Sequence, residues 1–385
     1  MGKRKRIGLI YIWDEKWLGG KYYLQNLMIA LNMLHDEIKP LINLYCLSED
    51  SFRDFQDNTK YPYLEKTIVK IGILYKVCHK LLSLFSKEAS LRINMFSLNE
   101  ADDWVFPISI GSNSDKMISW IPDFQEKHFP QFFTKADIAF RDNLVRSICR
   151  RGIPIVFSSY DSQNDFKYFY NDYKVHPTFV VHFAVNQPDF TAVKIDNVLH
   201  KYGINKSYLI CPNQFWLHKN HLFLFKVFKE CLEKGLDLQL VCTGRMKDHR
   251  CPKYIKEVKS FLEDNHLEED ILTLGVIDKL ELLCLMRYSY AVVQPSLFEG
   301  WNTTVEDSKA MNKFIFLSDL NVHREQISKN VCFFNPHDEK DLVQKLLTVS
   351  PTEEFFDYSN CIRQFGEDFY HVIELSQVNI HSSSD

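Results

Sequence analysis

The sequence lacks the features that would assign it to a membrane, secreted or disulfide-rich class. Its first apolar run, residues 7–13, is broken at once by Asp14, Glu15 and Lys16. Such a run is too short for a signal peptide, or for the ~20 apolar residues of a membrane-spanning helix. The 10 cysteines never form a Cys-x-x-Cys pair and stand singly in apolar segments. We therefore expect reduced core cysteines in a cytoplasmic protein.

Strong charge of one sign and cofactor fingerprints are missing too. The net charge is −4 and the only dense basic run is residues 3–6, so we expect no nucleic-acid partner. No Gly-x-Gly-x-x-Gly string follows a strand-like run, which argues against a nicotinamide oxidoreductase. No Asp-x-Asp string does so either, and His218 and His221 have no third metal ligand nearby. The sequence thus predicts neither a metal ion nor a cofactor.

The length and composition of the chain indicate two globular domains. It has 385 residues, of which 45% are hydrophobic and 25% charged, a balance typical of packed domains of ~150 to 200 residues each. We predict an N-terminal domain over residues 1–190, a C-terminal domain over 191–353, and a last helix over 354–385 that packs back on the first domain. The active site is expected in a cleft between the halves.

The order of apolar runs predicts the α/β class. In the first domain, a strand at 7–13 is followed by a loop through Gly19 and Gly20 and an amphipathic helix at 22–34; residues 50–100 give no clear pattern. The second domain alternates regularly between strand-like and helix-like segments, which indicates a doubly wound parallel sheet whose ligands lie beyond the carboxyl ends of its strands. The strand-like runs are residues 208–211, 238–243, 271–274, 291–293 and 314–317.

The most informative segment is residues 295–310, which follows a predicted buried strand and opens a predicted helix. Gly300 would let the backbone approach a ligand, and the unpaired amides of the helix start would attract a phosphate. Glu299 lies just outside that phosphate site, where a carboxylate suits sugar hydroxyls. Glu306 and Asp307 follow about one turn later and could reach a ribose, although they could equally complement the helix dipole. The capping types at the helix start are Asn302, Thr303 and Thr304, preceded by Trp301.

This segment resembles the donor-binding signature of the retaining GT-B glycosyltransferases of family 4, also called glycosyl transferases group 1. Their signature has two glutamates separated by seven residues; here Asp307 holds the second position and Glu306 stands just before it. Residues 211–221 resemble the first strand-to-helix loop of the family's nucleotide domain, in the form found in its polysaccharide-building branch. In that loop Lys219 matches the phosphate-binding lysine, Asn213 belongs to the typical string, and Gln214 stands where an arginine is usual.

Weaker likenesses complete the candidate site. Arg245, after the second strand of the C-terminal domain, could contact the diphosphate or the base. Gly19 and Gly20 match the family's glycine loop against the donor. Residues 120–133 resemble the polysaccharide branch, except that Glu126 replaces an expected histidine; Asp123 and His128 are the polar side chains expected on the acceptor side.

The resemblance implies a GT-B fold of two Rossmann-like domains facing a cleft, and a retaining, metal-independent transfer of a sugar from a nucleotide-sugar donor. Glu299 and Lys219 would be the catalytic residues. The acceptor would be a saccharide or a lipid-linked glycan in surface polysaccharide biosynthesis, and a lipid-borne acceptor would bring the enzyme to the inner face of the membrane. Two alternatives use the same fold: a catalytically silent nucleotide-sugar-binding protein and a nucleotide-sugar epimerase.

Overall fold

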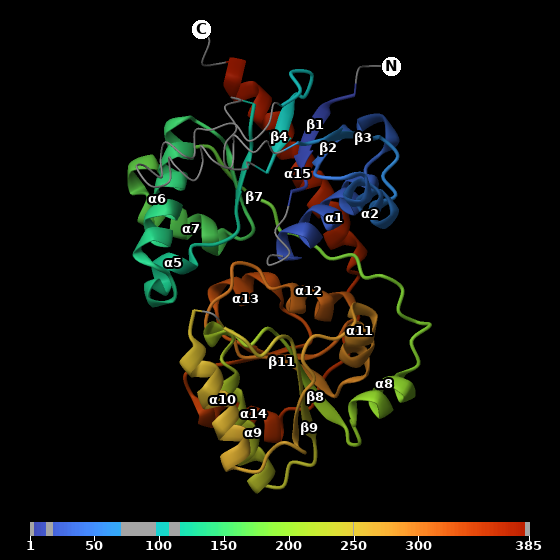
Figure 1. The fold of residues 1–385 in the computed structure, drawn as a ribbon, viewed down its shortest axis with the longest axis vertical. Helices are drawn as coiled ribbons and strands as arrows, with labels where there is room; N and C mark the ends of the chain where they lie inside the picture. Colours follow the sequence, from blue (N-terminus) through green and yellow to red (C-terminus); the bar gives the residue numbers. More distant parts are fainter. Residues whose placement is uncertain (1–3, 13–17, 71–97, 108–115, 249, 382–385) are drawn as a thin grey trace. The chain divides into compact units, whose positions relative to one another are not determined.

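The computed structural model describes residues 4–12, 18–70, 98–107, 116–248 and 250–381. It divides the chain into two compact units, shown in Figure 1. The first unit contains Met1–Asn186 and Ser359–Asp385, and the second contains Gln187–Tyr358. No helix in the described parts of the chain is both long and apolar enough to cross a membrane.

The first unit contains two small parallel sheets. One has the strand order β3-β2-β1-β4 and the other the order β5-β6-β7, and a single bridge between Val105 and Met117 joins their edges. The strands are β1 (Arg6–Ile10), β2 (Leu41–Cys46), β3 (Leu64–Ile68), β4 (Trp104–Phe106), β5 (Ser119–Ile121), β6 (Ile155–Phe157) and β7 (Thr178–Val180). The main helices are α1 (Leu18–Asn32), α2 (Glu49–Thr59), α5 (Gln125–His128), α6 (Lys135–Arg150) and α7 (Tyr160–Phe169).

The last helix of the chain, α15 (Ser359–His381), packs against α1 within the first unit. The contact is close because Gly366 faces the α1 backbone: a β-carbon there would lie 2.5 Å from the carbonyl oxygen of Ala30. The helix begins later than residue 354, because residues 351–357 run in a non-helical conformation. Asn312 and Asn330 hold that segment by hydrogen bonds to the backbone of Phe356 and Glu354.

The second unit is a six-stranded parallel sheet with helices on both faces. Its strand order is β10-β9-β8-β11-β12-β13, so the order reverses between β8 and β11, where a doubly wound sheet binds its ligand. The strands are β8 (Tyr208–Pro212), β9 (Gln239–Thr243), β10 (Ile271–Thr273), β11 (Ala291–Gln294), β12 (Ile315–Ser318) and β13 (Val331–Phe334). The sequence did not predict β13, whose first three residues are only half-buried at the sheet edge.

Two apolar clusters explain why this sheet is covered on both sides. Successive residues along β8, such as Leu209 and Ile210, belong to different clusters, because successive side chains of a strand point to opposite faces. The helices α9 (His221–Glu233), α10 (Pro252–Asp264) and α14 (Glu339–Thr348) pack on one face. The helices α8 (Ile195–Tyr202), α11 (Lys279–Tyr288) and α12 (Thr303–Ala310) pack on the other, with the short α13 (Asn321–Gln326) following β12.

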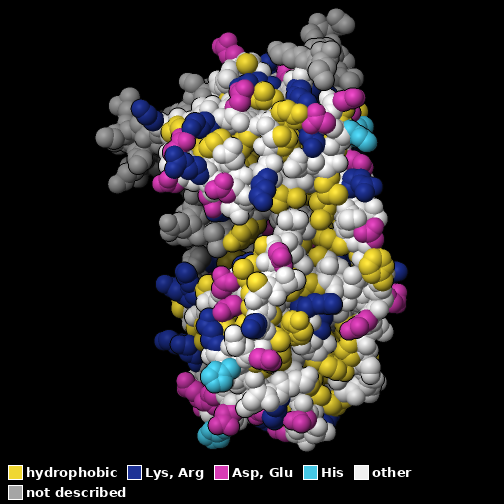
Figure 2. Space-filling model, turned by 90° about the vertical axis from the view of Figure 1, so that its right-hand side faces the viewer, with side chains coloured by type: hydrophobic (Ala, Val, Ile, Leu, Met, Phe, Trp, Pro, Cys, Tyr) yellow, Lys and Arg dark blue, Asp and Glu magenta, His cyan; other side chains and the backbone are white. Residues whose placement is uncertain are grey.

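Charged side chains of both signs are interspersed on the face shown in Figure 2. This distribution agrees with the net charge of −4.

Candidate functional site

The loops after β8 and β11 are tied together at the point where the strand order reverses. The side-chain amides of Asn213 and Gln294 hydrogen bond to each other and are both buried. The backbone amide of Leu297 donates to the carbonyl oxygen of His218 over 2.7 Å. Asn213 is predicted to bind the donor, but in the structure its side chain joins the two loops that carry Lys219 and Glu299.

Lys219 and Glu299 meet across these two loops. The Lys219 ammonium lies 2.5 Å from Oε1 of Glu299, and the two side chains are only 13% and 9% exposed. The sequence predicts both residues for the site from separate motifs, and the structure brings them together. A cation and a carboxylate held side by side at the carboxyl edge of a parallel sheet can bind a phosphate and a sugar hydroxyl respectively.

The start of α12 forms the third element of the site. Asn302 caps this helix: its Oδ1 accepts hydrogen bonds from the backbone amides of Thr304, at 2.9 Å, and Val305, at 3.4 Å. Among the described residues, Nδ2 of Asn302 has no hydrogen-bond partner although it is buried. Gly300 is buried just before the cap, Trp301 is half-buried and Thr303 is exposed. A buried donor without a partner at a helix N-terminus favours an anion such as phosphate.

The two carboxylates of α12 have different partners. Glu306 is 1% exposed, and its oxygens bond Lys309, Gln326 and Tyr358. Asp307 is 4% exposed. Its Oδ2 lies 2.8 Å from the Lys279 ammonium, at the start of α11, and its Oδ1 accepts from Gln187 over 3.1 Å. Asp307 thus faces the loop that follows β10, whereas Glu306 faces α13.

Gln214 and Arg245 connect the loops after β8 and β9. Oε1 of Gln214 accepts a hydrogen bond from the backbone amide of Arg245 over 2.9 Å. The Arg245 carbonyl accepts from the amide of Phe215 over 3.3 Å. Arg245 is exposed, and no carboxylate among the described residues forms an ion pair with it. Gln214, in the position where an arginine is usual, thus holds the backbone of a neighbouring arginine.

Three histidines of the second unit are buried: His218, His221 and His323. The sequence drew attention to His218 and His221 by their spacing, but not to His323. His323, on α13, is fully buried; its Nδ1 lies 2.7 Å from the Ser318 carbonyl. Burial lowers the pKa of His323 to about 4, so the ring is neutral near pH 7. Burial also lowers the pKa of His218 well below its usual value. No cluster of three potential metal ligands occurs in the described parts of the chain.

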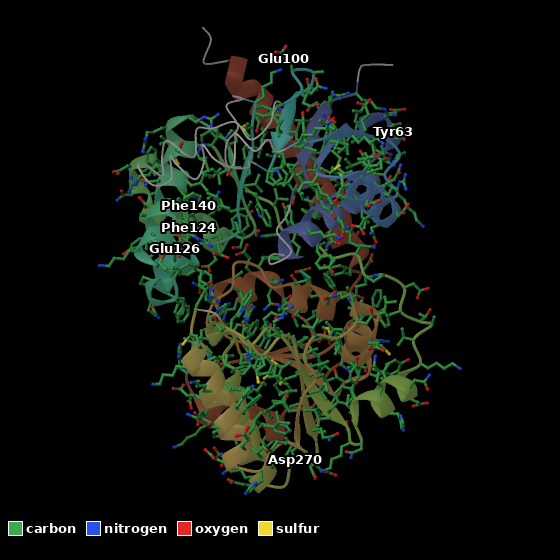
Figure 3. The ribbon with its side chains drawn as sticks, viewed as in Figure 1. Tyr63, Glu100, Phe124, Glu126, Phe140 and Asp270 are labelled. Carbon is green, nitrogen blue, oxygen red and sulfur yellow. The ribbon has the colours of Figure 1, made fainter. Side chains whose placement is uncertain are left out.

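The acceptor-side candidates lie in the first unit. Nε2 of His128 lies 2.7 Å from Oδ2 of Asp165, and this hydrogen bond raises the pKa of His128. Oδ1 of Asp123 accepts from the backbone amide of Gln125 over 3.0 Å. Glu126, labelled in Figure 3 on α5, is 2% exposed, lies 3.2 Å from Arg141, and has a pKa raised by burial.

Gly19 and Gly20 also belong to the first unit, but not to a loop. They lie in the first turn of α1, which starts at Leu18. The prediction of a glycine loop at these positions is therefore wrong. A helix tolerates glycine in its first turn, where the amides have no partner within the helix and can still meet a ligand.

Comparisons with known proteins identify the class of fold. The structure is similar to Anabaena HepE in complex with UDP-glucose, with a TM-score of 0.59 at 12% identity over 99% of this chain and 100% of that chain. It is also similar to a glycosyltransferase from Rickettsia africae, with a TM-score of 0.59 at 14% identity over 97% of this chain and 94% of that chain. The predicted GT-B fold of two Rossmann-like domains is thereby confirmed.

A family model matches most of the second unit. Residues 195–357 match the model of the family described as glycosyl transferases group 1. A curated relative, the O-antigen chain mannosyltransferase RfbU of Salmonella typhimurium strain LT2, is 25% identical over 191 residues. This match spans about half of the chain and about half of the relative, 49% of each.

Proposed function

We propose that the protein is a retaining, metal-independent glycosyltransferase that moves a sugar from a nucleotide-sugar to a saccharide or lipid-linked glycan in surface polysaccharide biosynthesis. The observation that carries this proposal is the Lys219–Glu299 pair, 2.5 Å apart, in a unit whose helix α12 begins with a buried, unpaired Nδ2 of Asn302. The family match supports it, and so does the relative that is named an O-antigen mannosyltransferase.

The geometry suggests how the donor would be held. The diphosphate would draw the Lys219 ammonium away from Glu299 and accept a hydrogen bond from Nδ2 of Asn302 at the start of α12. Glu299 would then accept hydrogen bonds from hydroxyls of the sugar. Arg245 would supply the second cation in place of the arginine that Gln214 replaces. Asp307 would bind the ribose: its carboxylate would give up its ion pair with Lys279 and accept hydrogen bonds from the ribose hydroxyls.

The reaction would break the bond between C1 of the sugar and the diphosphate oxygen. Lys219 and Nδ2 of Asn302 would stabilise the negative charge on the departing diphosphate. Glu299 would stabilise the positive charge that grows on the sugar ring. The acceptor hydroxyl would attack C1 from the same face, and its proton would pass to the leaving phosphate, so that configuration is retained. Asp123 and His128 of the first unit would bind the acceptor, and a lipid-borne acceptor would bring the enzyme to the membrane surface.

The test is a screen of purified protein against UDP-, GDP-, dTDP- and ADP-linked sugars, with thermal shift and nucleotide release measured together, with and without EDTA. We expect one donor both to stabilise the protein and to lose its nucleotide, unaffected by EDTA. Stabilisation without release, even with glycan acceptors, would indicate a silent binding protein. Free sugar isomers formed without acceptor would indicate an epimerase, and loss of release in EDTA would refute metal independence.

A further inference from the structure

Gln326, the last residue of α13, holds the N-terminal turn of α12 from outside that helix. Its Oε1 accepts from the backbone amide of Asn302 over 3.2 Å, and its Nε2 donates to the Asn302 carbonyl over 2.7 Å. The same Nε2 donates to Oε1 of Glu306 over 2.8 Å. Gln326 is 4% exposed. Because water cannot replace these bonds easily, Gln326 helps to fix the backbone of Asn302, the cap residue of α12, from outside the helix.

Glu306 is the charged centre of this arrangement. The Lys309 ammonium lies 3.0 Å from Oε1 and 3.3 Å from Oε2, and the Tyr358 hydroxyl donates to Oε2. The Lys309 ammonium also lies 5.7 Å from the centre of the Tyr358 ring. A carboxylate that is 1% exposed needs such partners, because burial of an unpaired charge is costly. Both oxygens of Glu306 are therefore engaged on the side of α12 that faces α13.

Tyr358 comes from the segment that leads into α15, and this segment is fixed to the second unit. Asn330 accepts from the backbone amide of Glu354 over 2.7 Å and donates to its carbonyl over 2.7 Å. Asn312 accepts from the amide of Phe356. Tyr358 itself is 7% exposed. Its hydroxyl is thus presented to Glu306 by a backbone held at two points.

We propose that Tyr358 is a positioning residue for the donor diphosphate, acting through Glu306 and Gln326 on Asn302. The hydrogen bonds form one buried series, from the Tyr358 hydroxyl to Glu306, from Gln326 to Glu306, and from Gln326 to the backbone of Asn302. The position of Asn302 sets the direction of its Nδ2, a buried donor without a partner among the described residues. The inference rests on the proposed function, in which this donor binds phosphate, and it assigns Glu306 to this series rather than to the ribose.

The test uses the full chain and the nucleoside diphosphate of the donor that the screen selects. Calorimetry measures the Kd of this nucleoside diphosphate. Tyr358→Phe removes one donor to a buried carboxylate, so Glu306 and Gln326 shift and Nδ2 of Asn302 loses its alignment. We expect Kd to rise ~10-fold. In a Glu306→Gln background, Tyr358→Phe should cause no further loss, because its effect passes through the carboxylate. Gln326→Met, which removes the last link, should weaken binding at least as much as Tyr358→Phe.

Tyr208→Phe is the matched control. Tyr208 is a buried tyrosine of the same unit whose hydroxyl donates to the Leu285 carbonyl over 2.8 Å, at the first residue of β8. It should lower Tm by a similar amount without changing Kd. Equal Kd values for wild type, Tyr358→Phe and Gln326→Met would overturn the inference while leaving the proposed function intact. If wild type bound no nucleoside diphosphate, the proposed function would fail first, and the inference with it.

Discussion

Gly244 lies directly against the backbone of Asn213. A β-carbon at position 244 would be 2.2 Å from the Asn213 carbonyl oxygen, and the φ angle of Gly244 is +100°. The turn after β9 can therefore approach the turn after β8 only because position 244 has no side chain. The close approach also brings the Arg245 amide to within 2.9 Å of Gln214.

Gly244→Ala should consequently impair donor binding as well as stability. Its methyl group would meet backbone atoms, which cannot turn aside, so the loop carrying Arg245 must shift away from Gln214. Gly235→Ala is the control, because Gly235 has a φ of +90° and no atom within 4 Å of a built β-carbon. Both variants should lose ~1 kcal/mol or more of unfolding free energy from the left-handed backbone. Only Gly244→Ala should weaken nucleoside diphosphate binding, as measured by calorimetry.

Removing either member of the Lys219–Glu299 pair should lower turnover by at least ~100-fold, the scale for a positioned electrostatic group. Lys219→Ala should also weaken the nucleoside diphosphate alone, whereas Glu299→Ala should mainly weaken the sugar conjugate. Lys226→Ala breaks an exposed ion pair between Lys226 on α9 and Glu339 on α14, at 3.8 Å, and should leave turnover unchanged. Steady-state kinetics and circular dichroism provide the measurement, and near-normal turnover in a folded variant would exclude that residue from the site.

Asp307→Asn should weaken ligands that carry ribose hydroxyls. The neutral amide is a poorer hydrogen-bond acceptor for those hydroxyls than the carboxylate. We expect a ~10-fold rise in Kd for the ribonucleoside diphosphate and little change for its 2′,3′-dideoxy analogue. An equal rise for both ligands would show that Asp307 acts on the fold, through Lys279 and Gln187, instead of on the ribose.

The buried His323 predicts a pH dependence of stability. Its pKa falls from an ordinary value of 6.5 to about 4 in the folded chain, because burial disfavours the charged ring. Between these two values the unfolded chain binds the proton more readily. The stabilisation is therefore present above pH ~6.5 and is lost as the pH falls toward ~4, by up to about 3 kcal/mol.

Urea unfolding of wild type and His323→Asn at several pH values would measure this contribution. The variant should lose less unfolding free energy than wild type between pH ~6.5 and ~4. The pKa of His218 is also lowered by burial, and this histidine is present in both proteins, so its contribution to the pH dependence cancels in the difference. Parallel pH curves for the two proteins would contradict the prediction.

The strands of the second unit could be predicted from sequence because they are buried on both faces and appear as continuous apolar runs. The run at 208–211 corresponds to β8 and that at 291–293 to β11. Much of the first unit could not be predicted so well, because strands such as β4 and β5 have only three residues, too few to show a period. The predicted strand at 7–13 is β1, which ends at Ile10; Trp13 lies outside the described residues.

By itself, the sequence determined the alternation of strands and helices and the motifs around Lys219 and Glu299, because these depend on residues close together in the chain. Only the tertiary structure decided which side chains of those motifs already have hydrogen-bond or ion-pair partners within the protein. Glu306 and Asp307 are neighbours in sequence, yet the partner of one is Tyr358, 52 residues later, and that of the other is Lys279, 28 residues earlier. Burial makes such partners necessary, and only the fold brings them within hydrogen-bonding distance.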